Sequence, residues 1–335
     1  MTAAPIPFAP HPRFVLFRAE TPRDDFAADV RAGLTSPHKW LPPRWFYDEL
    51  GSSLFDAICF LPEYYVMRAE AEVLTAHTSE IARELGTNVR LVELGSGAAR
   101  KTRILLDALT ERQPDLEYVP VDVDGSMLER VGHDLLSTYP RLRVTAVVAD
   151  FARPSVPLAM LPSTNARTVV LFLGSTIGNL DPDQALAMLR DLRTSLRPGD
   201  ALFLGADLRK SKSILEPAYD DALGVTAAFN LNLLQRMNRE LDANFDLTAF
   251  RHRAFYDEER GRIEMHLVSQ REQRVRIGAL DLDVDFAAGE SIHTESSYKH
   301  NDATLASLAA NAGFTVARQW TDRGTFFADV LMIAS

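Results

Sequence analysis

The sequence predicts an α/β protein with a Rossmann-like parallel sheet and a second, smaller α+β unit. Through the middle of the chain, apolar β-rich runs alternate with amphipathic helical stretches, a pattern typical of a parallel sheet. The run VVLFLG at 169–174 is apolar throughout, as expected of a strand that is buried on both faces. Residues 249–286 instead alternate with period two, which indicates antiparallel strands.

The elements can be assigned in order along the chain. Helical segments are expected first, at 24–34, 45–60 and 68–85. The parallel strands are expected at 89–94, 118–122, 144–148, 169–173 and 201–205, with helices at 100–111, 126–138 and 182–196 between them. A long helix at 219–245 and the antiparallel strands follow, with turns at 257–261 and Gly278. A helix at 302–310 and strands at 315–320 and 326–333 close the chain.

Composition narrows the class of function. The formal charge is −10, which repels phosphate backbones and argues against a nucleic-acid partner. Cys59 is the single cysteine, so no intramolecular disulfide can form. The start of the chain lacks the features of a signal peptide, and no run approaches 18 apolar residues, so we expect a cytoplasmic monomer without a membrane partner. The eight histidines show no paired ligand spacing, so no metal site is expected.

The strongest local signal is VELGSG at 92–97, which ends a strand and opens a helix. Glycine lets the backbone approach a ligand closely and adopt positive φ. A dinucleotide site would add a third glycine at position 100, where this chain has arginine. Glu93 adds negative charge beside the loop, which suits a sulfonium cation better than a pyrophosphate.

Acids stand at the ends of the next two strands. Asp122 lies where an acid can hold both ribose hydroxyls. Asp150 can accept from an adenine amino group while the Phe151 ring covers the base. Either acid alone could be a helix N-cap. Three strand ends in order, each with the expected group, predict a class I methyltransferase that binds S-adenosylmethionine.

The antiparallel segment is then expected to be an insertion, because methyltransferase-type sheets usually finish with a helix and a strand hairpin. It would pack with the N-terminal helices as a lid or substrate domain over the carboxyl edge of the sheet. The expected methyltransferase core comprises 66–206 and 297–335, and the substrate domain comprises 20–65 and 207–296.

Most of the chain, from about Leu41 to His300, resembles the ergothioneine-pathway histidine Nα-methyltransferases. The most distinctive similar segments are FLGSTIGNL and AYDDALGVTAAFNLNLLQRMNREL. The others are LPPRWFYDELGSSLFDAICFLPEYYVMRAEAE, VELGSGAARKTRILLDAL, RIEMHL and HTESSYKH. The resemblance implies that methyl groups pass from S-adenosylmethionine to the α-amino group of L-histidine, three in succession, giving hercynine without a metal.

The resemblance also implies roles for individual residues. Those expected to contact S-adenosylmethionine are Gly95, Lys101, Asp122, Asp150 and Phe151. Those expected to hold the α-carboxylate of the amino acid are Gly174, Asn179 and Tyr219, and those lining its amino and imidazole sides are Tyr47 and Tyr64. Those expected at the imidazole are Glu295 and Ser297, which would bond its nitrogens, and Met265, which would pack beside the ring. The expected catalytic residues are Tyr47, Asn179 and Tyr219.

The chemistry agrees with these roles. Methyl transfer needs nitrogen, carbon and sulfur in line, so positioning is the main task of the enzyme. The attacking amine must be neutral, and an amine of this type titrates at about 8. We therefore expect neutral groups around it, with Glu295 kept at the imidazole end. A site built around polar groups rejects apolar analogues by roughly 10⁴–10⁵, because they leave those groups unpaired.

Plainer interpretations remain open from the residues alone. Tyr47, Tyr64 and Met265 could be core residues, Asn179 could be a turn residue, and Glu295 could lie in a solvated loop. The alternative functions are methylation of another small amino acid or of a modified histidine, and a catalytically silent protein that binds S-adenosylmethionine. A nicotinamide dehydrogenase is disfavoured by the missing third glycine.

Overall fold

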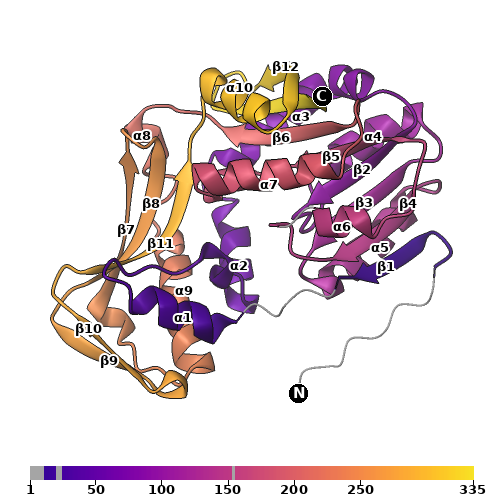
Figure 1. Ribbon diagram of the computed structural model, residues 1–335. Helices are drawn as coiled ribbons and strands as arrows, with labels where there is room; N and C mark the ends of the chain where they lie inside the picture. Colours follow the sequence, from indigo (N-terminus) through magenta and orange to yellow (C-terminus); the bar gives the residue numbers. More distant parts are fainter. Residues whose placement is uncertain (1–10, 20–24, 153–154) are drawn as a thin grey trace.

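The computed structural model describes residues 11–19, 25–152 and 155–335 (Figure 1). The expectations for most of the proline-rich start of the chain and for positions 20–24 lie outside these residues. No helix in the described ranges is long and apolar enough to cross a membrane.

A large, mostly parallel sheet forms one of the two parts of the molecule (Figure 1). Its strands are, in spatial order, β1 (Phe14–Arg18), β4 (Arg143–Val148), β3 (Glu117–Asp122), β2 (Val89–Leu94), β5 (Arg167–Phe172), β6 (Ala201–Asp207), β13 (Phe327–Ala334) and β12 (Phe314–Thr321). Only β13 runs antiparallel to its neighbours β6 and β12. The order reverses between β2 and β5, and ligands of such sheets bind outside the carboxyl ends of the strands at that point.

Helices cover both faces of this sheet and give it two apolar cores. One core contains α3 (Val66–Leu85), α4 (Thr102–Arg112) and α5 (Gly125–Thr138). The other contains α7 (Pro182–Thr194) and α10 (Asp302–Asn311), and α6 (Ser155–Ala159) contacts α7. The expected elements of the sheet and its helices are confirmed to within two residues at each end. Strand β1, which pairs with β4, was not expected.

The remaining elements share a third core (Figure 1). Its helices are α1 (Phe26–Leu34), η1 (Pro43–Phe46), α2 (Glu49–Ile58), α8 (Lys212–Leu215), α9 (Val225–Glu240) and η3 (Leu247–Ala249). Its strands are β7 (Phe250–Asp257), β8 (Arg262–Ser269) and β11 (Ser291–Tyr298) in one sheet, and β9 (Gln273–Ile277) and β10 (Leu282–Phe286) in a hairpin joined by η4 (Gly278–Leu280). The antiparallel strands and both turns expected at 249–286 are confirmed.

Three expectations are corrected, and local chemistry explains two of them. The helix expected at 219–245 begins only at Val225, because Gly224 is left-handed and the Asp221 carboxylate accepts from the first amides. The helix expected at 45–60 is interrupted, because Asp48 caps α2 by accepting from Gly51 N at 2.7 Å. The polar run 291–298, left open as a loop, is strand β11.

Candidate active site

The glycine loop at 95–97 (the glycine cradle) follows β2 at the point where the strand order of the sheet reverses. Gly95 has φ 67° and Gly97 has φ 48°, which glycine adopts without steric cost. The Gly95 amide donates to Val121 O at 2.9 Å, which ties the loop to the end of β3. A Cβ on Gly95 would lie 3.4 Å from the Phe151 ring, so glycine leaves the space beside that ring free. The loop and the aromatic ring expected at the cofactor are therefore brought together.

The two acids expected at the cofactor lie at the same edge. Asp122 Oδ2 accepts from Gly97 N at 3.0 Å, so this carboxylate also holds the glycine loop. Asp150 Oδ1 accepts from Ala152 N at 2.8 Å. Ala149 N donates to Asp122 O at 3.0 Å, which places the ends of β3 and β4 side by side. Both acids are partly exposed and keep acceptor capacity, which fits the hydroxyls and amino group of S-adenosylmethionine.

Lys101 lies on the other side of the loop. Its ammonium pairs with Glu70, a fully buried acid on α3. The Glu70 carboxylate also accepts from Gly174 N at 2.8 Å, and a Cβ on Gly174 would lie 3.4 Å from Lys101 Nζ. Lys101 and Glu70 thus connect the glycine loop to Gly174, an expected substrate residue after β5.

Glu93 does not face the cofactor cradle as the sequence suggested. It is 5% exposed and lies beneath the loop, where its carboxylate accepts from Thr102 Oγ1 at 2.6 Å and from the Tyr118 hydroxyl. Burial raises the pKa of Glu93 to about 7, although both hydroxyls and Lys101 oppose the shift. Glu93 therefore stabilises the region under the glycine loop through its hydrogen bonds with Thr102 and Tyr118.

Replacing Glu93 by glutamine should change how stability depends on pH. Because burial raises the folded-state pKa from 4.5 to about 7, the contribution of Glu93 to folding is complete below pH 4.5 and is lost as pH rises to about 7. Glu93→Gln keeps an acceptor for the hydroxyls but cannot ionise, so above pH 7 it should be more stable than wild type by roughly 2–4 kcal/mol. Urea unfolding across this range measures the effect, with exposed Glu111→Gln as control. Parallel pH profiles for wild type and Glu93→Gln would contradict it.

A β-bulge in β11 determines which way Glu295 faces. His293 pairs with His266 of β8, but Glu295 pairs with Met265, because the register shifts between them. Paired residues share a face of a sheet, so the bulge turns Glu295 to the Met265 side. Without it, Glu295 would lie on the same face as His293. Met265 itself is 2% exposed and belongs to the core.

Glu295 is an acid without a protein partner. No residue in the described ranges hydrogen-bonds to its carboxylate. Loss of solvation in the pocket raises the pKa of the Glu295 carboxyl to about 7, and the Lys299 ammonium partly opposes this shift. Glu295 is close enough to Tyr47, Tyr64 and Tyr219 to affect their ionisation.

Tyr219 and Ser297 form a buried polar cluster next to Glu295. The Tyr219 hydroxyl lies 2.9 Å from Ser297 Oγ, and Lys299 Nζ donates to Tyr219 at 2.8 Å and to Ser297 at 2.9 Å. Lys299 also pairs with fully buried Asp207 at 2.7 Å. Burial disfavours the charges, but the Lys299 ammonium lowers the pKa of Asp207 and the Asp207 carboxylate raises the pKa of Lys299. The Lys299 ammonium therefore stays charged and donates to the hydroxyls of both Tyr219 and Ser297.

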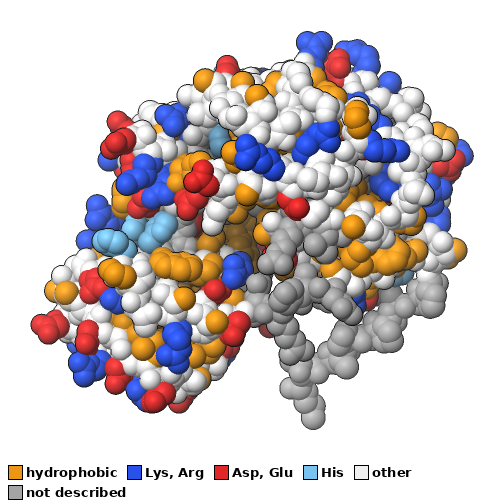
Figure 2. Space-filling view, in the orientation of Figure 1, with side chains coloured by type: hydrophobic (Ala, Val, Ile, Leu, Met, Phe, Trp, Pro, Cys, Tyr) orange, Lys and Arg blue, Asp and Glu red, His pale blue; other side chains and the backbone are white. Residues whose placement is uncertain are grey.

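Aromatic rings extend this cluster toward α2. The Tyr64 and Tyr219 rings are 6.1 Å apart, and Tyr64 and Tyr47 each lie edge-on to Phe55, at 6.3 and 5.5 Å. Tyr47 also contacts Phe229 of α9 and is 45% exposed. In Figure 2, the surface is hollowed between the two parts of the molecule, with hydrophobic side chains in the hollow. The structure thus brings Tyr47 and Tyr64 near the cluster, packed against aromatic neighbours, and their roles at the substrate stay predictions.

Asn179 ends η2 (Thr176–Asn179), which packs against β11. A Cβ on Gly178 would lie 2.7 Å from Tyr298 O, so glycine allows η2 to pack closely on β11. The Asn179 amide forms no hydrogen bond with any residue that the structure describes, and it is partly exposed. Its free donors and acceptor suit a ligand better than the turn role left open above.

Sequence reasoning missed Asp207 and Lys299. Lys299 follows Glu295 and Ser297 at a spacing of two, which places all three on one face once β11 is known to be a strand. The pairing of Lys299 with Asp207 has no local signal. His266 follows Met265 in strand β8 and therefore lies on the opposite face of the strand from it.

The parallel sheet with its switch point, the glycine cradle and the two acids define a class I methyltransferase that uses S-adenosylmethionine. More specifically, the chain belongs to the family described as histidine-specific, SAM-dependent methyltransferases, whose model matches residues 26–334. It is 47% identical to the histidine N-alpha-methyltransferase of Mycolicibacterium smegmatis, covering 91% of this chain and 93% of that protein. The Mycobacterium tuberculosis protein of the same name is also 47% identical, covering 89% and 92%. Ergothioneine biosynthesis protein 1 of Schizosaccharomyces pombe is 30% identical over 84% of this chain, which spans 37% of its length.

Removing the Asp122 carboxylate should weaken cofactor binding. Hydrogen bonds to a charged group contribute about 1.5–3 kcal/mol each, so losing two ribose contacts should raise the Kd for S-adenosylhomocysteine at least 100-fold. Asp122→Asn keeps an oxygen for Gly97 N and should lose less. Calorimetry measures the effect, with exposed Asp115→Ala near the opposite end of β3 as control. If Asp122→Ala bound S-adenosylhomocysteine as tightly as the wild type does, Asp122 would not contact the ribose.

Proposed function

We propose that this chain transfers three methyl groups in succession from S-adenosylmethionine to the α-amino group of L-histidine and releases hercynine. The family and the relatives support histidine as the substrate. One observation carries the assignment of the pocket. The Glu295 carboxylate, on the same face as Met265, forms no hydrogen bond with any described residue and lies beside two hydroxyls held by Lys299. The sequence prediction of a cytoplasmic monomer stays a prediction.

The hydrogen bonds of the cluster favour a neutral imidazole. Lys299 donates to both Tyr219 and Ser297, so each hydroxyl oxygen already accepts one hydrogen bond. If Tyr219 donates to Ser297, the Ser297 proton is free to donate to the imidazole nitrogen that carries a lone pair. Glu295 then accepts the N–H of the other nitrogen. An apolar amino acid would leave both groups unpaired, which is the basis of selectivity.

The opposite end of the amino acid would meet Gly174, Asn179 and Tyr219. The Lys299 ammonium behind Tyr219 favours the α-carboxylate at this end. Asn179 and Tyr47 offer neutral polar groups to the amine, and such contacts do not favour the unreactive ammonium form. Tyr64 would close the side of the imidazole against Tyr219. These residues bind and orient the amine; the cofactor supplies the electrophilic methyl group on its sulfonium.

The unit that carries β7–β10, most of β11 and α9 is proposed to act as the substrate domain. We place its boundaries at 20–65 and 207–296, and those of the methyltransferase core at 66–206 and 297–335, with 20–24 outside the described residues. Glu295 and Met265 would then come from the substrate domain, while Gly174, Asn179 and Ser297 would come from the core. A substrate held between the two units is shielded from water during transfer.

A time course of product mass tests the proposal. Purified protein with excess S-adenosylmethionine should convert L-histidine into species carrying one, two and finally three additional methyl groups. Dimethylhistidine supplied as substrate should also be methylated. Accumulation of monomethylhistidine as the end product would contradict three successive transfers. Methylation of the imidazole ring, located by fragmentation, would contradict the orientation set by Glu295.

A further inference from the structure

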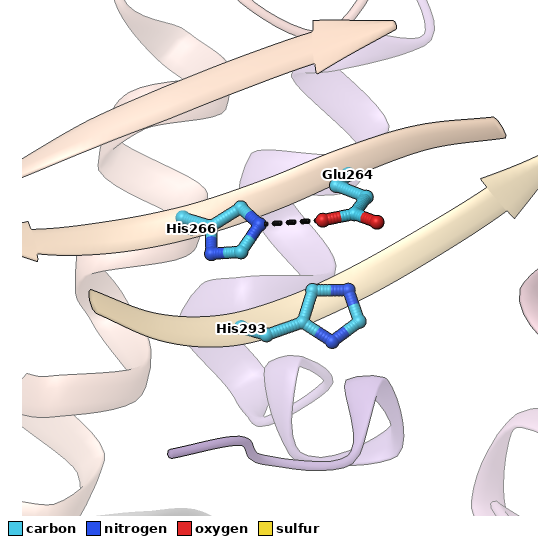
Figure 3. Close-up of side chains that lie close together, drawn as sticks. All are labelled: Glu264, His266 and His293. Carbon is cyan, nitrogen blue, oxygen red and sulfur yellow. Dashed lines mark hydrogen bonds and ion pairs between the residues drawn. The ribbon is translucent and has the colours of Figure 1, made fainter. Parts of the chain in front are cut away.

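A second cluster of chemistry-bearing side chains lies on the outer face of the β8–β11 pair (Figure 3). Glu264 and His266 stand two residues apart on β8, and His293 lies opposite His266 on β11. One carboxylate oxygen and one nitrogen of each ring all lie within 4.8 Å of one another. None of the three faces Met265 or Glu295, so the cluster is separate from the active site. From this geometry we infer a binding site for a divalent transition metal of the zinc type.

The spacing of the donor atoms supports coordination. His266 Nε2 and Glu264 Oε2 lie 2.9 Å apart. Two ligands that are each about 2.0–2.2 Å from a tetrahedral Zn²⁺ are separated by roughly 3.3–3.6 Å. A metal could therefore replace the proton that this pair shares, with small movements of the side chains. The His293 ring, 5.0 Å from the His266 ring between centroids, would supply the third ligand.

The outer hydrogen bonds have the form found around metal ligands. His266 Nδ1 lies 3.1 Å from Ser291 Oγ, and Arg262 Nε donates to Glu264 Oε1 at 2.9 Å. His293 Nε2 lies 3.0 Å from Glu295 O. Such contacts orient a metal ligand and leave its second polar atom free to bind the metal. For His293, rotating the ring by half a turn exchanges the nitrogen that contacts Glu295 O with the nitrogen that would bind the metal.

The charges favour a nitrogen-preferring metal. The Glu264 carboxylate is already paired with Arg262, whose Nε donates to Oε1 at 2.9 Å. The Arg262 and Arg253 cations are near the cluster, so a hard ion that depends on several carboxylates is disfavoured. Two imidazoles and one carboxylate suit Zn²⁺, Co²⁺ or Ni²⁺.

A metal here would join β8 to β11, the strands that carry Met265 and Glu295. The ring of His293 contacts the main chain of Glu295 directly, so the metal would stabilise the strand pair that sets the direction of this acid. With three protein ligands, at least one coordination position stays open to water. The site is therefore inferred to stabilise the substrate side of the fold, with no part in methyl transfer.

Titration of the metal-stripped full chain with ZnCl₂ tests the inference. We expect one Zn²⁺ per chain by calorimetry, a higher Tm, and visible absorption when Co²⁺ is the probe. Mutating a residue that only orients a metal ligand already costs about 10- to 100-fold in affinity. Replacing a ligand itself, as in His266→Gln, His293→Gln or Glu264→Gln, should therefore raise the Kd at least tenfold. His77→Ala, on α3 away from the cluster, should bind as wild type does.

A measurement on the wild type keeps the test independent of variant folding. Zn²⁺ should protect His266 and His293, but not His77, from acylation by diethyl pyrocarbonate, as mapped by mass spectrometry. Absence of stoichiometric binding would overturn the inference. Binding that persists undiminished in the His266→Gln/His293→Gln double variant, or protection that omits both histidines, would overturn it as well.

Discussion

Alanine in place of Glu295 is expected to lower kcat/KM for L-histidine by about 10- to 150-fold. The variant loses a charge-assisted hydrogen bond to the imidazole, which contributes about 1.5–3 kcal/mol. Ser297, Tyr219 and Lys299 keep their contacts with one another, so cofactor affinity should not change. Steady-state kinetics measure the first quantity, and calorimetry with S-adenosylhomocysteine measures the second.

The same variant should lose selectivity. An apolar amino acid no longer leaves a carboxylate unpaired in Glu295→Ala, so the ratio of kcat/KM for histidine over phenylalanine should fall. Glu259→Ala removes an exposed acid from the β7–β8 turn and serves as the matched control. An unchanged selectivity ratio would mean that Glu295 does not contact the substrate ring.

Methionine in place of Lys299 is expected to lower the free energy of unfolding by about 3–5 kcal/mol. Lys299 and Asp207 are both almost completely buried, and removing one partner of a buried ion pair leaves the other charge poorly compensated. Lys210 also pairs with Asp207, at 2.5 Å, and limits the loss. The variant also deprives Tyr219 and Ser297 of their shared donor, so KM for histidine should rise in the fraction that folds.

Urea unfolding followed by circular dichroism measures the loss. The matched control is Lys212→Met, which removes an exposed lysine from an (i, i+4) pair with Glu216. Surface pairs of this kind contribute about 0–1 kcal/mol. If Lys299→Met lost no more stability than Lys212→Met, the buried pair would not hold the cluster together.

The parts of the fold that could be predicted are those with strong local patterns. The strands of the central sheet are continuous apolar runs, and their bounds follow from that pattern. The acids at strand ends were found because parallel strands bring their carboxyl ends to one edge. In contrast, β11 reads SIHTESSY, and its small polar residues give no apolar period.

The inner face of the active site depends on features that no local pattern encodes. The bulge after His293 decides that Glu295 lies with Met265, and a strand prediction alone would have placed it with His293. Lys299 and Asp207 meet only through the fold, as do Glu70 and Lys101. The resemblance to a family identified Glu295 and Ser297, but not the cation that holds Tyr219 and Ser297 together.

The most direct test of the account is a substrate panel. The purified chain would be incubated with S-adenosylmethionine and, separately, with each of the twenty amino acids, and the mass of each amino acid would be followed. The account predicts that L-histidine alone gains methyl groups, up to three on the α-nitrogen. Methylation of a different amino acid, with histidine unchanged, would contradict it.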